Sequence, residues 1–293
     1  MERSEPDTPA GRPGSIEEID LIEHIDALNR AGRLALTVYL VHGHPSVAAS
    51  EAAFESLRRV GAIFECGLPV PSLSGTSASA AIVRAHEGAS RNGLSDEESI
   101  AFYARYRPNL LLHVEDGRRG GQALFERVRG AFDAVTTDDA SFEAVLHDSA
   151  MRGEAAPLLV RSVSALSTTL ESDIVVPRGD EDTVIHLGVA SLTGGELLPA
   201  ARIQEALERI ATVAPRARVL CGFGIRSAAD ATRVRRLRGV HGITVGTEAL
   251  NRLEAGLPEF DAWLAGIDAA LDGGRDTRAN GEARASGEDR LHG

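Results

Sequence analysis

The chain contains no lysine: all 31 of its basic residues are arginine, and 43 acidic residues outnumber them. Without a side-chain primary amine the protein cannot form a Schiff base, which excludes imine-forming aldolases and covalently anchored pyridoxal phosphate. The net charge of -12 also disfavours binding to nucleic acid or to an anionic membrane surface. These absences direct attention to small-molecule ligands and to chemistry that needs no amine.

Cysteines, aromatic residues and long apolar runs are also scarce. Cys66 and Cys221 are the only cysteines and each lies in a strand-like run, so we expect two buried free thiols and no disulfide. We find neither a signal peptide nor an apolar run of about 18 residues, and therefore expect a cytoplasmic protein with no membrane partner. Aromatic residues make up only 4%, which leaves Ala, Val, Leu and Ile to form the core, as in parallel α/β proteins.

Both ends of the chain are rich in Gly, Arg and acidic residues. We predict that residues 1–15 and 272–293 are disordered tails and that residues 16–271 form a single domain. That domain begins with a predicted helix, because an isoleucine recurs at every third position from Ile16 to Ile25.

Short apolar runs then alternate with amphipathic stretches, which is the pattern of repeated βα units. Eight such units in one chain favour a closed barrel over an open doubly wound sheet, because closure removes both sheet edges. We therefore predict an α/β fold: a (β/α)8 TIM barrel with an extra N-terminal helix. The predicted strands are residues 34–41, 62–66, 109–114, 134–137, 157–160, 183–187, 219–223 and 242–245.

Glycines follow the last two predicted strands. Gly224 comes after the seventh, Gly246 comes after the eighth, and Thr247 begins a helix. Backbone N–H groups beside glycine can approach an anion closely, and a helix N-terminus adds partial positive charge. Together with Thr193 and Gly194 after the sixth strand, these residues predict a site for a phosphate-bearing small molecule. The alternative is that the glycines only permit tight turns.

Glu65 is the candidate general acid or base. It lies in an apolar strand-like run, where loss of hydration should raise the pKa of a carboxyl group. The alternative is a structural glutamate that accepts hydrogen bonds.

Histidines suggest a different site. His42 and His44 lie two residues apart at a strand end, so we expect both side chains to point the same way. With His113 and Glu115 after the third strand, they could bind a divalent metal in a metal-dependent aldolase or hydrolase. Solvated loop histidines are the alternative.

Five motifs follow one another along the chain: the Gly-x-Pro turn at Gly43 to Pro45, Glu65-x-Gly67-x-Pro69, Thr193-Gly194, Gly222-Phe223-Gly224-Ile225 and Gly246-Thr247. Their order resembles that in the alpha chain of tryptophan synthase over nearly the whole folded part. The resemblance implies a TIM-barrel lyase of tryptophan biosynthesis that splits indole-3-glycerol phosphate into indole and glyceraldehyde 3-phosphate, without cofactor or metal.

The resemblance also assigns roles to residues. It implies that Glu65 is the acid–base residue. The phosphate-binding positions that it implies are Gly194, Gly224, Gly246 and Thr247. The substrate-lining positions are Tyr39, His113, Glu115, Asp139, Ile185 and Thr193, of which His113, Glu115 and Ile185 replace other residues of the family.

One loop departs from the family pattern. The family's glutamate is followed by a loop that ends in an aspartate, the second acid–base residue and part of the contact with a beta-chain partner. Here the loop at residues 70–77 has no carboxylate, and Ser74 or Thr76 takes the place of the aspartate. The departure therefore concerns both the catalytic pair and the partnership.

Two hypotheses follow. The first is a diverged lyase that cleaves indole-3-glycerol phosphate or a related phosphorylated polyol, with Glu65 as general acid and base and no Schiff base. The second is a non-catalytic phosphate-ligand-binding homologue that has lost half of the acid–base pair. The retained Glu65 favours the enzyme, because burial of an unused carboxylate costs stability.

Overall fold

The computed structural model describes residues 20–71, 73, 78–113, 121–174, 182–191 and 195–273. Its strands form one sheet in which every pair of neighbours is parallel, in the order β5-β4-β3-β2-β1-β9-β8-β7-β6. The strands are β1 (Ala35–Val41), β2 (Ile63–Gly67), β3 (Asn109–His113), β4 (Ala134–Thr137), β5 (Leu158–Leu159), β6 (Arg161–Ser164), β7 (Thr183–Gly188), β8 (Ala217–Gly222) and β9 (Gly242–Val245).

The predicted fifth strand, residues 157–160, contains β5, and the chain continues directly into β6, which the sequence did not predict. β5 pairs with β4, and β6 pairs with β7 on the other side. Between the two halves, the backbone N–H of Val160 donates to the carbonyl of Val135 at 2.8 Å. One short segment of chain thus joins both ends of the sheet, which confirms the predicted barrel. The other predicted strands agree with the structure to within two residues at each end.

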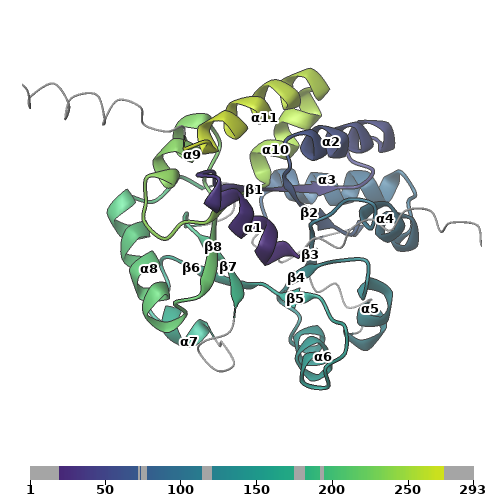
Figure 1. The fold of residues 1–293 in the computed structure, drawn as a ribbon. Helices are drawn as coiled ribbons and strands as arrows, with labels where there is room; N and C mark the ends of the chain where they lie inside the picture. Colours follow the sequence, from purple (N-terminus) through teal and green to yellow (C-terminus); the bar gives the residue numbers. More distant parts are fainter. Residues whose placement is uncertain are drawn as a thin grey trace, which may run out of the picture.

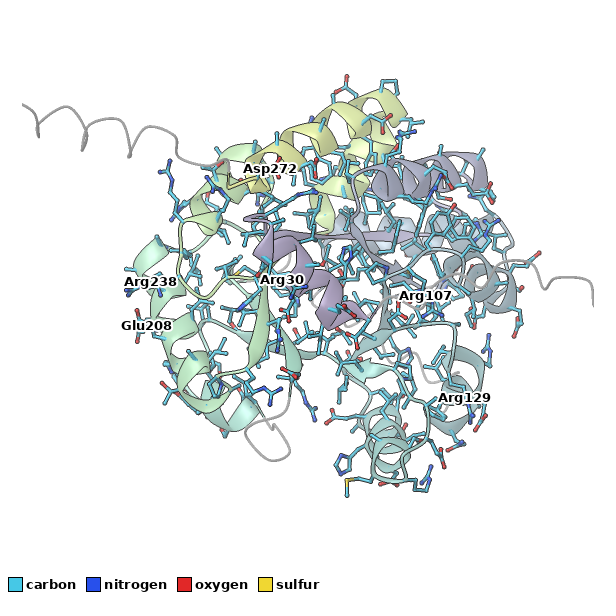
Figure 2. The ribbon with its side chains drawn as sticks, viewed as in Figure 1. Arg30, Arg107, Arg129, Glu208, Arg238 and Asp272 are labelled. Atoms are coloured by element: carbon cyan, nitrogen blue, oxygen red, sulfur yellow. The ribbon has the colours of Figure 1, made fainter. Side chains whose placement is uncertain are left out.

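The helices surround the strands (Figure 1). Charged side chains such as Glu208 and Arg238, which form a 3.1 Å ion pair, lie at the outside of this ring (Figure 2). No described helix is long and apolar enough to span a bilayer. The outer helices are α2 (Val47–Arg59), α3 (Ala80–Arg91), α4 (Asp96–Tyr103), α5 (Gly121–Val128), α6 (Ala140–Met151), α7 (Leu170–Asp173), α8 (Ala200–Val213), α9 (Ala228–Arg235), α10 (Thr247–Ala255) and α11 (Leu257–Leu271).

The predicted N-terminal helix is α1 (Leu21–Arg30), which begins after an N-cap at Asp20. Leu21 and Ile25 of this helix are buried in a cluster with the first inward-facing residues of the strands. Helix α1 therefore closes the N-terminal end of the barrel, and any ligand must enter from the C-terminal end. The other buried residues of the cluster are Ala35, Ile63, Leu110, Ala134, Val184 and Leu220 of the strands, and Val160 between β5 and β6.

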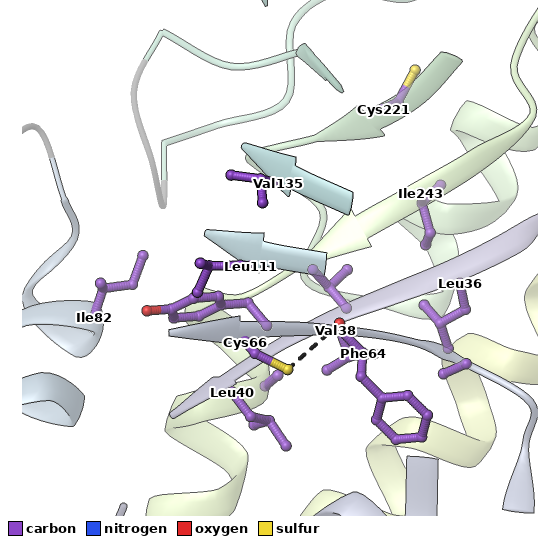
Figure 3. Close-up of a cluster of buried hydrophobic side chains, with 14 of the residues drawn as sticks. Leu36, Val38, Leu40, Phe64, Cys66, Ile82, Leu111, Val135, Cys221 and Ile243 are labelled. Atoms are coloured by element: carbon purple, nitrogen blue, oxygen red, sulfur yellow. Dashed lines mark hydrogen bonds between the residues drawn. The ribbon is translucent and has the colours of Figure 1, made fainter. Parts of the chain in front are cut away.

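Side chains along each strand alternate between the barrel interior and the helices. Figure 3 shows part of the helix-facing set, including Leu40, Cys66 and Leu111, packed with its neighbours in the main hydrophobic core. Cys66 and Cys221 are both buried free thiols, as predicted from the sequence. The thiol of Cys66 lies 3.6 Å from the carbonyl oxygen of Phe64 (Figure 3).

Most of the two predicted tails lies outside the described residues, as do positions 16–19 of the predicted helix. The exceptions are Asp272 and Gly273, which follow α11. The backbone N–H of Gly273 donates to the carbonyl of Gly32 at 2.9 Å, so the end of α11 lies beside the end of α1.

Candidate active site

The inward-facing residues form layers, because each layer of a tilted eight-stranded barrel takes side chains from alternate strands. Glu65 of β2 pairs through Leu110 with Ala134 of β4, and the next inward residue toward the rim is Thr136. Moving two strands across in register and then two residues toward the rim leads from Thr136 to His186 on β7. The same move leads from His186 to Thr244 on β9. From Thr244 the pairing returns through Thr37 of β1 to Glu65. We call Glu65, Thr136, His186 and Thr244 the polar layer.

The polar layer lies within reach of solvent. Its four residues keep 5 to 8% of their surface exposed, whereas Val160 and Leu220 of the layer beneath keep 1% each. Ser162 pairs with His186 in register and faces the interior, yet it is exposed. The barrel mouth is therefore open on this side, and a ligand that enters it meets polar groups before the apolar base.

Glu65 occupies the polar layer as a buried carboxyl group. Burial alone raises its pKa to about 7, from an ordinary value of 4.5. Among the described residues it has no ion-pair or hydrogen-bond partner that would hold it ionised. A carboxyl group with this pKa can both donate and accept a proton near neutrality, as a general acid and base requires.

Tyr39 lies beside Glu65 in the pairing register of β1 and β2. Its hydroxyl group lies 2.5 Å from Nε2 of His86 on α3, and a methyl group at Gly67 would come within 2.2 Å of the same hydroxyl. Burial, followed by the charge of Glu65, raises the pKa of the Tyr39 hydroxyl well above its usual range. Tyr39 is thus an uncharged side chain, held in place by His86, that lies next to the carboxyl group of Glu65.

Gly224 follows β8 at the rim. It has a φ of +75°, and a side chain there would crowd the backbone of Leu197 and Gly195 at 3.0 to 3.1 Å. The preceding residue, Phe223, is not a glycine but has a φ of 66°, a strained conformation of the kind that occurs at functional sites. The ring of Phe223 packs edge-on against His186, with the two ring centroids 5.1 Å apart.

Gly246 and Thr247 lie at the end of the neighbouring strand, β9. Gly246 is the N-cap residue of α10, and Thr247 is its first helical residue. The Thr247 hydroxyl is 2.9 Å from that of Ser79, the N-cap of α3. Because β8 and β9 are paired, the structure brings Gly224, Gly246 and Thr247 to adjacent strand ends at the same rim toward which the polar layer opens.

His186 faces the barrel interior, although the family resemblance implied Ile185 as the substrate-lining residue of this strand. Alternation places His186 on the inner face with Val184 and places Ile185 on the helix side, where it is fully buried. Nε2 of His186 reaches over Gly222, where an added methyl group would come within 2.0 Å of it. Burial lowers the pKa of His186 to about 4, so the imidazole is neutral near pH 7. The period of two along this strand is the sequence signal that puts Ile185 and His186 on opposite faces, and the strand register decides which of them faces the interior.

His113 and Asp139 lie away from the interior, against α6. The His113 ring meets Phe142 of α6 edge-on, with a centroid separation of 5.3 Å. Asp139 is the N-cap of α6, accepts hydrogen bonds from the backbone N–H groups of Ser141 and Phe142, and lies 3.5 Å from Nε2 of His113. His113 and Asp139 therefore pack against helix α6 and are not part of the proposed site.

The histidines of the metal hypothesis are not brought together. His42 stacks on Phe102 with centroids 4.0 Å apart, whereas Nε2 of His44 contacts Glu254 at 3.1 Å. The expectation that His42 and His44 point the same way was wrong, because β1 ends at Val41 and Gly43 turns the chain with a φ of +93°. Within the described part of the chain, no cluster of three metal-binding side chains is found.

Several predicted positions lie outside the described residues. They are Glu115, Thr193, Gly194 and, in the loop without a carboxylate, Ser72 and residues 74–77.

Comparisons with known proteins agree with one another. The chain is 26% identical over 250 residues to the tryptophan synthase alpha chain of Picosynechococcus, covering 80% of this chain and 91% of that protein. It is 27% identical over 264 residues to the corresponding chain of Mycobacterium bovis, covering 84% and 92%. No family profile matches the chain.

Solved structures show the same fold. Tryptophan synthase from Mycobacterium tuberculosis superposes with a TM-score of 0.71 at 22% identity, over 87% of this chain and 99% of that one. Tryptophan synthase subunit alpha from Legionella pneumophila superposes with a TM-score of 0.67 at 17% identity, over the same shares of the two chains.

Proposed function

We propose that this chain, a diverged homologue of the tryptophan synthase alpha chains, is a carbon–carbon lyase that cleaves a phosphorylated polyol by a retro-aldol reaction. The substrate is indole-3-glycerol phosphate or a related glycerol phosphate attached to another group. The observation that supports this proposal most is the buried Glu65, which has a pKa of about 7 and lies below the rim formed by Gly224, Gly246 and Thr247.

The reaction needs one proton shuttle. The carboxylic acid of Glu65 gives its proton to the ring carbon that carries the glycerol chain, and the resulting carboxylate removes the proton of the adjacent hydroxyl group. The bond between the ring carbon and the glycerol chain then breaks, and its two electrons return to the ring. The two electrons of the O–H bond form the second bond of the aldehyde C=O group. Glu65 ends protonated as it began, and the hydroxyl proton has moved to the ring carbon.

Two other features suit this chemistry. The ring accepts the bonding electrons itself, so the chain needs no lysine to form an imine, and it has none. A phosphate held by backbone N–H groups at Gly224 and Gly246, with the N-terminus of α10 at Thr247, would hold the glycerol chain over Glu65.

A cleavage assay tests the proposal. Purified protein is incubated with indole-3-glycerol phosphate, and the released indole and glyceraldehyde 3-phosphate are both measured. Glu65→Gln should lower kcat/KM by about 10² to 10⁴, because it removes the proton shuttle but keeps the shape of the side chain. Glu126→Gln, at an exposed position on α5, is the matched control and should leave the rate unchanged.

Two results would contradict the proposal. An unchanged rate in Glu65→Gln would remove the assigned mechanism. Binding of glycerol 3-phosphate without cleavage of any glycerol phosphate substrate would favour the non-catalytic binding protein.

A further inference from the structure

The polar layer contains more hydrogen-bonding atoms than the described structure satisfies. Thr136 Oγ1 and His186 Nε2 are buried and have no hydrogen-bond partner among the described residues. Glu65 adds a third polar group that faces the same interior. Buried polar groups in proteins are nearly always paired, so this interior is suited to a ligand that carries polar atoms.

An indole ring fits this interior poorly. Its only hydrogen-bonding group is one N–H, which can pair with a single acceptor. Placed here, the ring would cover Thr136 and His186 with carbon and leave at least one of their polar atoms unpaired. Sites built to hydrogen-bond a substrate atom reject an analogue that lacks it by factors of up to about 10⁴.

We propose that the group this chain splits from the phosphorylated polyol is a polar ring with a hydrogen-bonding atom beyond a single N–H, and that His186 is the residue that selects it. The inference rests on the proposed function and narrows its substrate class.

The surroundings of His186 fix its ring. Nδ1 lies 3.4 Å from the hydroxyl oxygen of Ser162, Phe223 packs edge-on against it, and Nε2 reaches over Gly222 into the interior. The absence of a side chain at Gly222 makes this reach sterically feasible. Because the burial-lowered pKa keeps the imidazole neutral, Nε2 can either donate or accept a hydrogen bond, depending on the tautomer.

Binding of non-cleavable compounds tests this inference without turnover. The reference compound is 3-(indol-3-yl)propyl phosphate, and its matched partners are the four isomers in which one benzo-ring C–H of the indole is replaced by nitrogen. Dissociation constants are measured by calorimetry at pH 7.5 for the full chain. At least one isomer should bind about tenfold or more tightly than the indole compound, which is the expected effect of one additional hydrogen bond in a buried site.

Three variants assign the preference to His186. His186→Leu should bring the isomers and the indole compound to within about twofold of each other, and an apolar leucine suits a buried position. His186→Gln, which keeps a hydrogen-bonding end group, should retain part of the preference. His42→Leu, which removes a buried imidazole on the helix side of the barrel, should retain all of it.

Equal binding of the indole compound and every isomer, or a preference that survives in His186→Leu, would overturn the inference and leave the proposed lyase intact. Failure of all the compounds to bind would overturn the inference together with the phosphate site. Slow cleavage of indole-3-glycerol phosphate that Glu65→Gln lowers further supports the lyase and agrees with the inference. Cleavage that Glu65→Gln leaves unchanged contradicts the lyase alone and leaves the binding preference measurable.

Discussion

At the scale of single residues, the polar layer holds two buried ionisable groups whose pKa values move in opposite directions. Burial raises the pKa of Glu65 to about 7 and lowers that of His186 to about 4. Both groups are therefore neutral between these values, although both would be charged in the unfolded chain over part of that range. Near neutral pH, part of the Glu65 population loses its proton, which suits the proposed proton shuttle.

Stability should show the two effects as opposite slopes. Glu65 binds its proton more tightly in the native state, so its contribution to the free energy of unfolding falls by about 3 kcal/mol from pH 4.5 to about 7. His186 binds its proton less tightly in the native state, so its contribution rises by about 3 kcal/mol from about pH 4 to 6.5. The two slopes nearly cancel while both residues are present.

Single variants should separate the slopes. In Glu65→Gln the free energy of unfolding should rise between pH 4.5 and 6.5 relative to the parent, and in His186→Leu it should fall over the same range. Denaturant unfolding at several pH values measures both, and the double variant should again resemble the parent. Parallel pH profiles for the two single variants would show that the assigned pKa values are incorrect.

At the scale of elements, helix α1 acts as a plug for the barrel base. Ile25 is fully buried in the cluster of first inward residues, whereas Ile22 on the same helix is only partly buried. Ile25→Ala should therefore lower the free energy of unfolding by about 2 to 5 kcal/mol through lost burial and a cavity. Ile22→Ala should cost clearly less, and it serves as the matched control in thermal or denaturant unfolding.

An equal loss in the two variants would show that the helix is not docked as described. Helix α1 also fills the interior at the N-terminal end of the barrel, where its buried residues pack with aliphatic residues from the strands. The four residues of the polar layer keep 5 to 8% of their surface exposed, whereas Thr37, which faces the interior one layer lower, is fully buried.

At the scale of the whole molecule, the loop at residues 70–77 bears on assembly. By the resemblance, a beta-type chain is the candidate partner and this loop is part of the contact, but it lacks the family's aspartate. We expect no stable complex when the chain is mixed with the beta chain of Mycobacterium tuberculosis tryptophan synthase and analysed by size-exclusion chromatography. The alpha chain of that organism is the positive control, and co-elution of the present chain would contradict the expectation.

The sequence by itself determined the barrel and most of its strands. Short apolar runs alternating with amphipathic stretches report burial, and burial of parallel strands on both faces is a local property of each segment. The sequence also identified Glu65, Gly224 and Gly246 as candidate site residues. A carboxylate in an apolar run and a glycine after a strand can each be recognised within a single segment of the chain.

Only the tertiary structure decided which polar residues share a layer. Glu65, Thr136, His186 and Thr244 lie on four strands that are far apart in the chain, and the strand register alone brings them level. A shift of one residue along β7 would place Ile185 instead of His186 on the inner face. No local sequence pattern determines which of the two residues faces the interior. Likewise, the turn at Gly43 separates His42 from His44, since alternation holds only while a strand continues.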